Sequence, residues 1–288
     1  MSKQKSKKIW IEGAIIVVFY LLLSPLLALP LYEKLLFFPD NSSFEPAVST
    51  IDRQLAQDGC LKQDVHFPSA QGDLLHGWYY INPRGRYVVL VSHGNGGNIS
   101  SRIYLVQSLV RCGCSVLLYD YQGYGTSSGV PSLSGICNDA NAAYDFLAKN
   151  KVIRQSGIIL YGESLGGGVS SALSLRRPAR AIVLQSTFPS LLYACRDRLW
   201  FTWLYPSHWF PVLDNLHVLS QGHAPALIVH GARDKVFPLA YARCLYNAAR
   251  PVKQLLVLDS MQHVLTASDQ AAFEAGMKTF LQSLDGHD

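Results

Sequence analysis

The sequence predicts an α/β fold in which a mostly parallel sheet is flanked by helices. From about residue 87 onward, short apolar runs typical of strands buried on both faces alternate with segments of helical spacing. The chain has 288 residues, 49% hydrophobic and 16% charged. This composition suits one large globular domain, with or without an appendage.

The first 32 residues differ from the rest in charge and hydropathy. A lysine-rich tail, residues 3–8, precedes the charge-free run Gly13–Tyr32, which is 20 residues long. A helix of this length spans about 30 Å, the thickness of a bilayer's hydrocarbon core. We therefore expect a tail and transmembrane anchor over 1–32. A cleaved signal peptide, for which the site after Ala28 is poor, and a membrane-associated hairpin are the alternatives.

The charge distribution bears on orientation and on partners. Four lysines of the tail supply four of the five net positive charges, which leaves about +1 for the rest of the chain. The domain thus lacks the basic face that nucleic-acid binding requires. The positive-inside rule predicts a single-pass membrane protein whose folded domain lies on the non-cytoplasmic side. The sequence specifies no oligomeric state.

The cysteines are scattered without a C-x2-C pair, so a zinc site of that kind is not expected. The sequence determines no disulfide pairing, and buried free thiols are expected for Cys112 and Cys114. The six cysteines are Cys60, Cys112, Cys114, Cys137, Cys195 and Cys244.

The elements follow in order along the chain. A connector over 33–60 leads into the domain, 61–288, which begins with a β-hairpin around the turn 69–72. Buried strands are then expected at 87–93, 115–120, 157–162, 181–186, 225–231 and 254–260. Helices are expected at 99–112, 134–150, 164–177, 238–249 and 267–284.

One segment, about 187–222, is too long for an ordinary connection between a strand and a helix. We interpret it as an inserted helical cap. Its aromatic side chains either pack the cap onto the sheet or form an apolar wall for a substrate chain. These side chains are Trp200, Phe201, Trp203, Tyr205, Trp209 and Phe210.

The segment 162–166, GESLG, has the spacing G-x-S-x-G and lies between an expected strand and an expected helix. A glycine-rich turn that happens to contain serine is the simple interpretation. However, this position is the one that exposes a nucleophilic serine on a tight turn, with glycines relieving the crowding. The N-terminal end of the following helix favours negative charge formed nearby. We therefore predict that Ser164 is a nucleophile.

A serine hydroxyl needs a base, and the base needs an acid that orients it. In this architecture the chain order is Ser, then Asp or Glu, then His, each beyond a strand. Asp234 follows the strand at 225–231, and His263 follows the strand at 254–260. Each alone is more typical of an ordinary loop residue, but the joint order predicts a Ser164–His263–Asp234 triad. Weaker competitors are Asp197, Asp214, Asp259, His208, His217, His223 and His287.

Backbone amides of Leu165 and Asn95 are the expected donors to the oxyanion formed during acyl transfer. Leu165 follows the nucleophile, and Asn95 lies in the glycine-rich loop SHGNGGN after the strand at 87–93. These glycines do not fit a dinucleotide fingerprint, because Ile99 stands where G-x-G-x-x-G requires glycine. We expect no metal and no organic cofactor.

Taken together, the motifs resemble the α/β-hydrolase superfamily over about residues 33–285. Within it, the chain resembles the membrane-anchored branch of α/β-hydrolase domain-containing serine hydrolases. The resemblance rests on LLFFPD, SHGNGGNIS, YDYQGYGTSSG, YGESLGGG, STFPS, HGARDKVFP and MQHV. That branch implies an α/β-hydrolase fold and includes esterases, thioesterases that remove fatty acyl groups from proteins, and members with no assigned substrate. The chain departs from its usual pattern at Gln122, where arginine is usual, and at Met261, where glycine is frequent.

We therefore expect a membrane-anchored serine hydrolase of the carboxylesterase or thioesterase type. Its expected substrates are acyl or lipid-like esters or thioesters, cleaved through an acyl-enzyme. A peptidase or an acyltransferase with the same triad is the first alternative, since both also proceed through an acyl-enzyme. The second is an inactive membrane scaffold that binds a partner through the cap.

Overall fold

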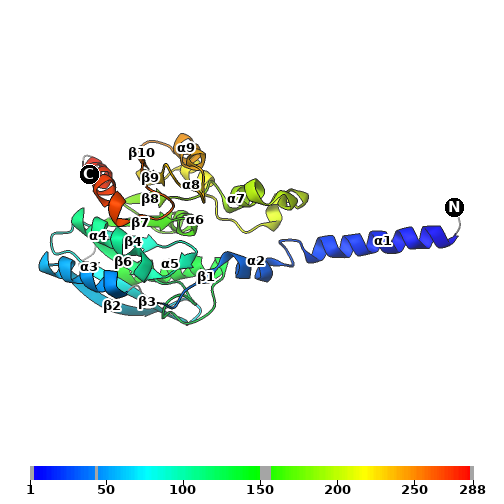
Figure 1. The fold of residues 1–288 in the computed structure, drawn as a ribbon, viewed down its shortest axis with the longest axis horizontal. Coiled ribbons are helices and arrows are strands. Elements are labelled where there is room, and N and C mark those ends of the chain that lie inside the picture. Colours follow the sequence, from blue (N-terminus) through cyan, green and yellow to red (C-terminus); the bar gives the residue numbers. More distant parts are fainter. Residues whose placement is uncertain (1–2, 43–44, 150–156, 286–288) are drawn as a thin grey trace.

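An eight-stranded sheet runs through the centre of the computed structural model, which describes residues 3–42, 45–149 and 157–285. The strand order is β10-β9-β8-β7-β4-β6-β3-β2 (Figure 1). Neighbours are parallel except β2–β3 and β3–β6, which are antiparallel. The strands are β2 (Leu61–Pro68), β3 (Leu74–Ile81), β4 (Tyr87–Ser92), β6 (Cys114–Tyr119), β7 (Ile158–Glu163), β8 (Ala181–Gln185), β9 (Ala226–Gly231) and β10 (Lys253–Leu258). The predicted α/β fold with a mostly parallel sheet is confirmed.

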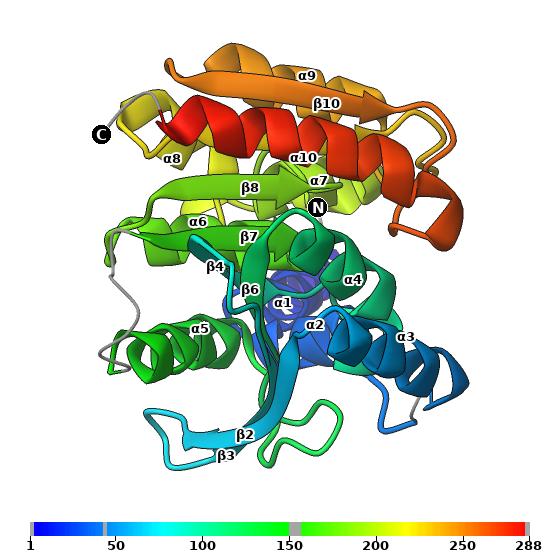
Figure 2. The same ribbon diagram turned by 90° about the vertical axis from the view of Figure 1, so that its left-hand side faces the viewer.

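Helices cover both faces of this sheet. One face carries α3 (Glu45–Gln57), α4 (Ile103–Arg111) and α10 (Gln270–Asp285), which lie on the same side in Figure 2. The other carries α5 (Leu133–Ala148), α6 (Leu165–Ser174), α8 (Asn215–Gln221) and α9 (Leu239–Ala248). Short 3-10 turns, η1 (Ile99–Arg102) and η5 (Ala267–Asp269), precede α4 and α10.

The apolar strands explain this layering, because successive side chains of a strand point to opposite faces. In β4, Val88 and Leu90 belong to the core under α5 and α6. Val89 and Val91 belong to the core under α3, α4 and α10. All six residues of β4 are buried, as expected for a strand covered on both faces.

The N-terminal prediction needs correction. The apolar run Gly13–Tyr32 is not one helix: α1 (Lys3–Leu22) ends first, and α2 (Leu29–Leu36) begins after a turn. Pro25 has no N–H to donate and disfavours helical backbone at Ser24. Ser24 Oγ instead donates to the Leu21 carbonyl at 2.6 Å. Within the described parts of the chain, no helix is both long enough and apolar enough to cross a membrane.

The helix α1 projects away from the body of the molecule (Figure 1). It meets the predicted cap near its end, where the rings of Tyr20 and Tyr205 stack with centroids 4.8 Å apart. The Tyr20 hydroxyl also donates to the Leu204 carbonyl at 2.8 Å. The expected location of the domain outside the cytoplasm stays a prediction.

The expected connector docks onto the loop that follows β4. Its short strand β1 (Phe38–Pro39) pairs in parallel with β5 (Gly96–Gly97). In addition, Glu33 of α2 accepts a hydrogen bond from the Leu133 N–H at the start of α5, at 2.8 Å. The connector thereby holds α2 beside the region where the predicted oxyanion donor Asn95 lies.

The segment interpreted as a cap contains only short helices. These are α7 (Leu191–Arg198), η3 (Trp200–Leu204), η4 (Ser207–Trp209) and α8. Trp200 and Trp203 are exposed, whereas Tyr205 is buried. All six cysteines are free thiols, and Cys114 is fully buried, while Cys112 is partly buried.

Candidate active site

Ser164 stands between β7 and α6 with a backbone φ of +54°. This left-handed conformation is uncommon for a residue with a side chain and stores local strain. The surrounding structure holds it in place: the Ser164 N–H donates to the Gln185 carbonyl at 2.9 Å. The Ser164 carbonyl accepts from the Thr187 hydroxyl at 2.7 Å. The local geometry is therefore that of a strained strand-to-helix turn that presents a serine.

The flanking glycines are required by close backbone approach. A Cβ at Gly162 would collide with the backbone of Gly166 and Gly167, and a Cβ at Gly166 would collide with the Ser92 carbonyl. The spacing G-x-S-x-G thus allows β7 and α6 to meet at this tight turn and pack against the end of β4.

Asp234, His263 and Ser164 form a continuous chain of hydrogen bonds. The Asp234 carboxylate lies 2.8 Å from His263 Nδ1, and His263 Nε2 lies 2.9 Å from Ser164 Oγ. With Nδ1–H donating to Asp234, Nε2 is free to accept the proton of the serine hydroxyl. The structure therefore brings the three predicted residues together from the loops after β7, β9 and β10.

The side chain of Asp234 is inaccessible to solvent, and its environment favours the ionised form. Burial alone would raise the pKa of its carboxyl. The hydrogen bond with His263, and the N–H groups of Phe237 and Val236, outweigh burial and lower that pKa below its usual value. Those two amides donate to Asp234 Oδ1 at 2.9 and 2.7 Å. A carboxylate with this support stays charged beside the imidazole.

Of the predicted oxyanion donors, Leu165 follows Ser164 directly, and Asn95 belongs to the loop after β4. Leu165 begins α6, where the first N–H groups of a helix have no acceptor within the helix. On the other side, a Cβ at Gly94 would lie only 3.3 Å from Ser164 Cβ, so the loop after β4 approaches the serine closely. In that loop, the Asn95 carbonyl accepts from Phe38 N–H at 3.0 Å, and its side chain donates to the Leu36 carbonyl at 2.7 Å.

A buried ion pair that the sequence analysis missed joins this loop to the nucleophile turn. Arg102 Nη2 lies 2.8 Å from Oε1 of Glu163, the residue before Ser164. The same guanidinium donates to the Gly96 carbonyl at 2.6 Å. Both side chains are almost fully buried. The signals available in the sequence were the acidic residue directly before the serine of GESLG and the arginine shortly after SHGNGGN. The sequence does not reveal that these two side chains meet.

Two buried histidines near the site were also missed. Burial and the nearby Arg102 lower the pKa of His93 to about 3, so its ring is neutral at pH 7. His230 Nε2 lies 3.6 Å from Asp234 Oδ2 and 3.0 Å from the Phe237 carbonyl oxygen. Burial also lowers the pKa of His230. Neither histidine contacts Ser164 in the way His263 does, so His263 is the candidate base.

The two departures from the family pattern have different consequences. The Gln122 N–H donates to the Asp139 carboxylate at 2.9 Å, and burial raises the pKa of Asp139 to about 7. The neutral Gln122, at the position where arginine is usual, thus lies beside the buried carboxyl of Asp139. Met261 is fully buried, and its carbonyl accepts from the Arg233 N–H at 3.1 Å. The loop carrying His263 is therefore anchored to the loop carrying Asp234.

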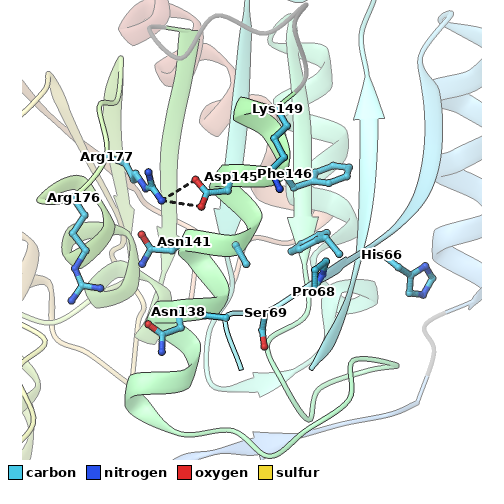
Figure 3. A pocket seen from close by; sticks show the side chains of 13 residues that line it. His66, Pro68, Ser69, Asn138, Asn141, Asp145, Phe146, Lys149, Arg176 and Arg177 are labelled. Atoms are coloured by element: carbon cyan, nitrogen blue, oxygen red, sulfur yellow. Dashed lines mark hydrogen bonds and ion pairs between the residues drawn. The ribbon is translucent and has the colours of Figure 1, made fainter. Parts of the chain in front are cut away.

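Two cavities are lined by none of the triad residues. An apolar cavity of about 310 Å³ lies between α2 and the predicted cap, lined among others by Leu36, Leu191, Phe201 and Phe210. Leu36 connects it to the predicted oxyanion loop through the hydrogen bond from Asn95. A second cavity, of about 600 Å³, lies between α5 and the end of the β2–β3 hairpin and includes none of the triad residues (Figure 3).

Residues 83–207 match the family model described as "Serine aminopeptidase, S33". This range includes Ser164 but not Asp234 or His263. An "Uncharacterized protein" of Mycobacterium tuberculosis strain H37Rv is 32% identical over 242 residues, which cover 80% of each chain. The "Alpha/beta hydrolase domain-containing protein WAV2" of Arabidopsis thaliana is 29% identical and covers 75% of each chain. The "Alpha/beta hydrolase domain-containing protein 17B" of Xenopus tropicalis is 33% identical over 61% of this chain and 60% of its own.

The solved structure of an esterase from Pyrococcus furiosus is similar in fold. It superposes with a TM-score of 0.68 at 19% identity, and the match covers 86% of this chain and 98% of the esterase. At this identity the likeness concerns the fold alone.

Proposed function

Because the chain belongs to the α/β-hydrolase superfamily, we propose that it is a serine hydrolase that cleaves acyl esters or thioesters through Ser164, His263 and Asp234. The observation that supports this most strongly is the unbroken hydrogen-bonded chain from Asp234 through His263 to the Ser164 hydroxyl. The three residues come from separate loops at the carboxyl ends of the strands, and Ser164 lies on a strained turn.

In the proposed first step, Ser164 Oγ attacks the substrate carbonyl carbon while His263 Nε2 takes the hydroxyl proton. Asp234 holds the imidazole and stabilises the imidazolium cation. The amides of Leu165 and Asn95 donate to the oxyanion of the tetrahedral intermediate. That intermediate collapses, His263 gives its proton to the leaving alcohol or thiol, and an acyl-serine remains. Water, deprotonated by His263, then releases the carboxylic acid and restores Ser164.

An apolar acyl group suits the cavity between α2 and the predicted cap. The cavity of about 310 Å³ is lined almost entirely by apolar side chains of α2 and the predicted cap. One of its lining residues, Leu36, binds the side chain of Asn95 through its carbonyl. A hydrocarbon chain placed there would leave water, at a gain of about 0.8 kcal/mol per buried CH₂ group. We therefore propose medium to long acyl chains in preference to acetyl.

An aminopeptidase is the second candidate, because the matching family model carries that description. Aminopeptidases bind a free α-ammonium group, which favours an acidic partner at the site. Glu163, the carboxylate next to Ser164, is already neutralised by Arg102. This pairing favours the ester or thioester substrate over a peptide with a free N-terminus.

The proposal is tested by comparing the wild-type protein with Ser164→Ala. A fluorophosphonate probe should label the wild type and fail to label Ser164→Ala, because the phosphonyl group is transferred to an activated serine. Ser170→Ala is the matched control: Ser170 is a buried serine of α6, the helix that follows Ser164, and its loss should leave labelling intact.

A series of p-nitrophenyl esters then measures the acyl preference. We expect kcat/KM to rise from acetate to octanoate. A preference for acetate would contradict the apolar acyl pocket. Faster cleavage of an amino-acid p-nitroanilide than of every ester would favour the aminopeptidase. A folded wild type that no fluorophosphonate labels would refute the hydrolase proposal and favour an inactive scaffold.

A further inference from the structure

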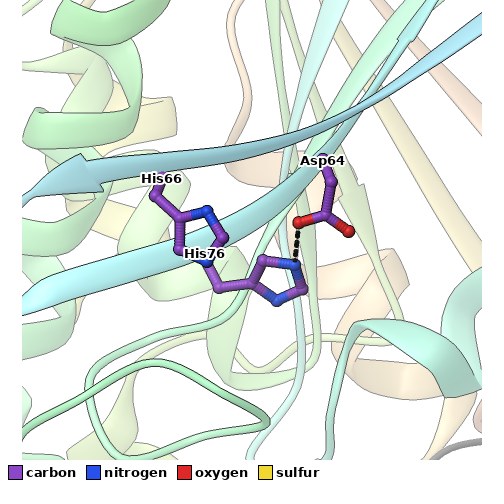
Figure 4. Close-up of side chains that lie close together, drawn as sticks. All are labelled: Asp64, His66 and His76. Carbon is purple, nitrogen blue, oxygen red and sulfur yellow. Dashed lines mark hydrogen bonds and ion pairs between the residues drawn. The ribbon is translucent and has the colours of Figure 1, made fainter.

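We propose that Asp64, His66 and His76 form a binding site for a divalent transition-metal ion of the zinc class. The three side chains lie on the β2–β3 hairpin, on residues outside the Ser164 site. Figure 4 shows the two histidine rings side by side and Asp64 directed at His76. A donor set of two imidazoles and one carboxylate is one that Zn²⁺ and its neighbours in the first transition series bind well.

The pairing of the two strands brings the three residues together. His66 of β2 stands directly opposite His76 of β3 in the antiparallel register. Asp64 is two residues before His66, so both side chains emerge on the same face of the strand. Directly opposite and same-face neighbours have Cβ atoms about 5 to 7 Å apart. This spacing lets three side chains converge on one point above the sheet.

The observed distances are close to those of a ligand set. One ligand atom from each residue lies within 4.8 Å of the other two. His76 Nε2 is already 2.7 Å from Asp64 Oδ1, and the two imidazole centroids are 5.0 Å apart. Metal–ligand bonds of about 2.0–2.2 Å separate tetrahedral ligand atoms by roughly 3.4 Å. Small rotations of the exposed side chains of Asp64 and His66 would supply that geometry.

A buried carboxylate stands behind His76, where metal-binding histidines usually have a partner. His76 Nδ1 is buried and, within the described residues, has no hydrogen-bond partner. Asp120 Oδ2, almost fully buried, lies 3.8 Å from it. A carboxylate on the second nitrogen orients a ligating imidazole and makes it a stronger ligand. His76 is thus arranged to present Nε2 to an ion while Nδ1–H turns to Asp120.

The cluster opens onto a cavity of about 440 Å³ that leaves room for a further ligand. Asp64, His66 and His76 line it together with Asn98, Ser100 and Asp120. A site with three protein ligands and one open position holds water or a small molecule as its fourth ligand. Asp120 also accepts from the Ile99 N–H at 3.0 Å, so a bound ion would be connected to the segment that follows the loop of Asn95.

The test is metal binding by the untagged full-length protein after chelator treatment and dialysis, so that no affinity tag contributes histidines. Calorimetric titration with Zn²⁺ should show one site that is lost, by at least about tenfold in affinity per removed ligand, in Asp64→Asn and His66→Ala. Both residues are exposed, so these variants should remain folded. His217→Ala removes an exposed histidine of α8 and should bind Zn²⁺ as the wild type does.

Co²⁺ provides a second readout that does not depend on heat. When Co²⁺ is added to the wild type or to His217→Ala, its visible absorption should become more intense than that of hydrated Co²⁺, as expected for an ion in a site of low symmetry. This increase should be absent in His66→Ala. Ca²⁺ should not compete, because it prefers oxygen ligands. Zn²⁺ binding that is equally tight in Asp64→Asn and His66→Ala, or no Zn²⁺ binding by the folded wild type, would overturn the assignment.

Discussion

Two buried carboxylates, Glu163 and Asp139, show how one neighbouring group decides whether a carboxyl is charged. Glu163 is paired with Arg102 at 2.8 Å. Asp139 is equally inaccessible, but it has the backbone N–H of Gln122 as a donor, and one of its oxygens has no partner among the described residues. Burial without a cation favours the protonated form, which is why the pKa of Asp139 rises to about 7.

Asp139 should make the protein less stable as the pH rises. Its carboxyl ionises near pH 4 in the unfolded chain and near pH 7 in the folded one, so the stability contributed by its protonated form is complete below pH 4 and is lost as the pH passes 7. Asp139→Asn cannot titrate. Between pH 5 and pH 8, we expect the free energy of unfolding of the wild type to fall by about 2–3 kcal/mol relative to that of this variant.

Urea denaturation of both proteins at the two pH values measures this difference. Asp145→Asn is a useful control, because that aspartate lies on the same helix but forms a surface ion pair with Arg177. Parallel pH profiles for the wild type and Asp139→Asn would show that Asp139 does not titrate in this range.

Removing Arg102 should be costly because it leaves Glu163 charged and buried. We expect Arg102→Met to lower the free energy of unfolding by about 3–5 kcal/mol. The double variant Arg102→Met/Glu163→Gln should lose less than the sum of its single changes, since no orphan charge remains. Equilibrium denaturation of the four proteins in this cycle gives the coupling energy. Simple additivity would mean that the observed ion pair does not couple the loop after β4 to the nucleophile turn.

At the scale of elements, the decisive feature is the junction between β7 and α6. Local sequence places a strand before Ser164 and a helix after it, but the junction also packs against the end of β4. This packing explains why glycine is needed at Gly166, where a side chain would meet the carbonyl of Ser92. The helix that follows starts at Leu165, so a small backbone shift here would move both Ser164 and a predicted oxyanion donor.

Gly166→Ala should therefore destabilise the protein and reduce labelling of Ser164 by a fluorophosphonate. Overpacking of this kind costs about 1–3 kcal/mol, and contact with backbone rather than a flexible side chain places it at the upper end. Gly222→Ala is the matched control, because an added Cβ there meets nothing within 4 Å. Denaturation and labelling should both distinguish the two variants, and wild-type behaviour of Gly166→Ala would contradict the packing argument.

At the scale of the whole molecule, α1 and the domain share few contacts. Tyr20 stacks on Tyr205 and bonds to Leu204, whereas the large apolar side chains of Trp10 and Ile16 are exposed. A protruding apolar helix of this kind adds exposed hydrophobic surface, which promotes association with other molecules. The sheet and the candidate active site are formed by residues that follow it.

Deleting residues 1–18, which retains Tyr20, should therefore leave the domain intact. We expect the free energy of unfolding to change by less than about 1 kcal/mol, since the lost surface residues make few packing contacts. Light scattering should show reduced self-association. Tyr20→Ala in the full chain separates the two effects, as it removes the contact with Tyr205 but keeps the apolar helix. Loss of cooperative unfolding in the truncated protein would contradict the prediction that the domain folds without residues 1–18.

The alternation of strands and helices and the mostly parallel sheet could be predicted from the sequence, because buried strands and amphipathic helices have local periodicities. The order of Ser164, Asp234 and His263 after separate strands was likewise readable along the chain, and their roles in catalysis stay a prediction. The absence of charge over Gly13–Tyr32 does not by itself make one continuous helix, because the chain turns at Ser24 and Pro25.

The contacts between residues far apart in the sequence became visible only in the folded chain. The contacts of Arg102 with Glu163 and of Asp64 with His76 depend on strand register and on loops converging at one sheet edge. Neither leaves a short motif, because their partners are separated by 61 and 12 residues. Cysteine spacing gave no reason to expect a metal, whereas the antiparallel pairing of β2 and β3 sets two histidines opposite each other. Hydrophobic periodicity arises between residues that are close in the sequence, whereas a binding site is formed by residues that are close only in the folded structure.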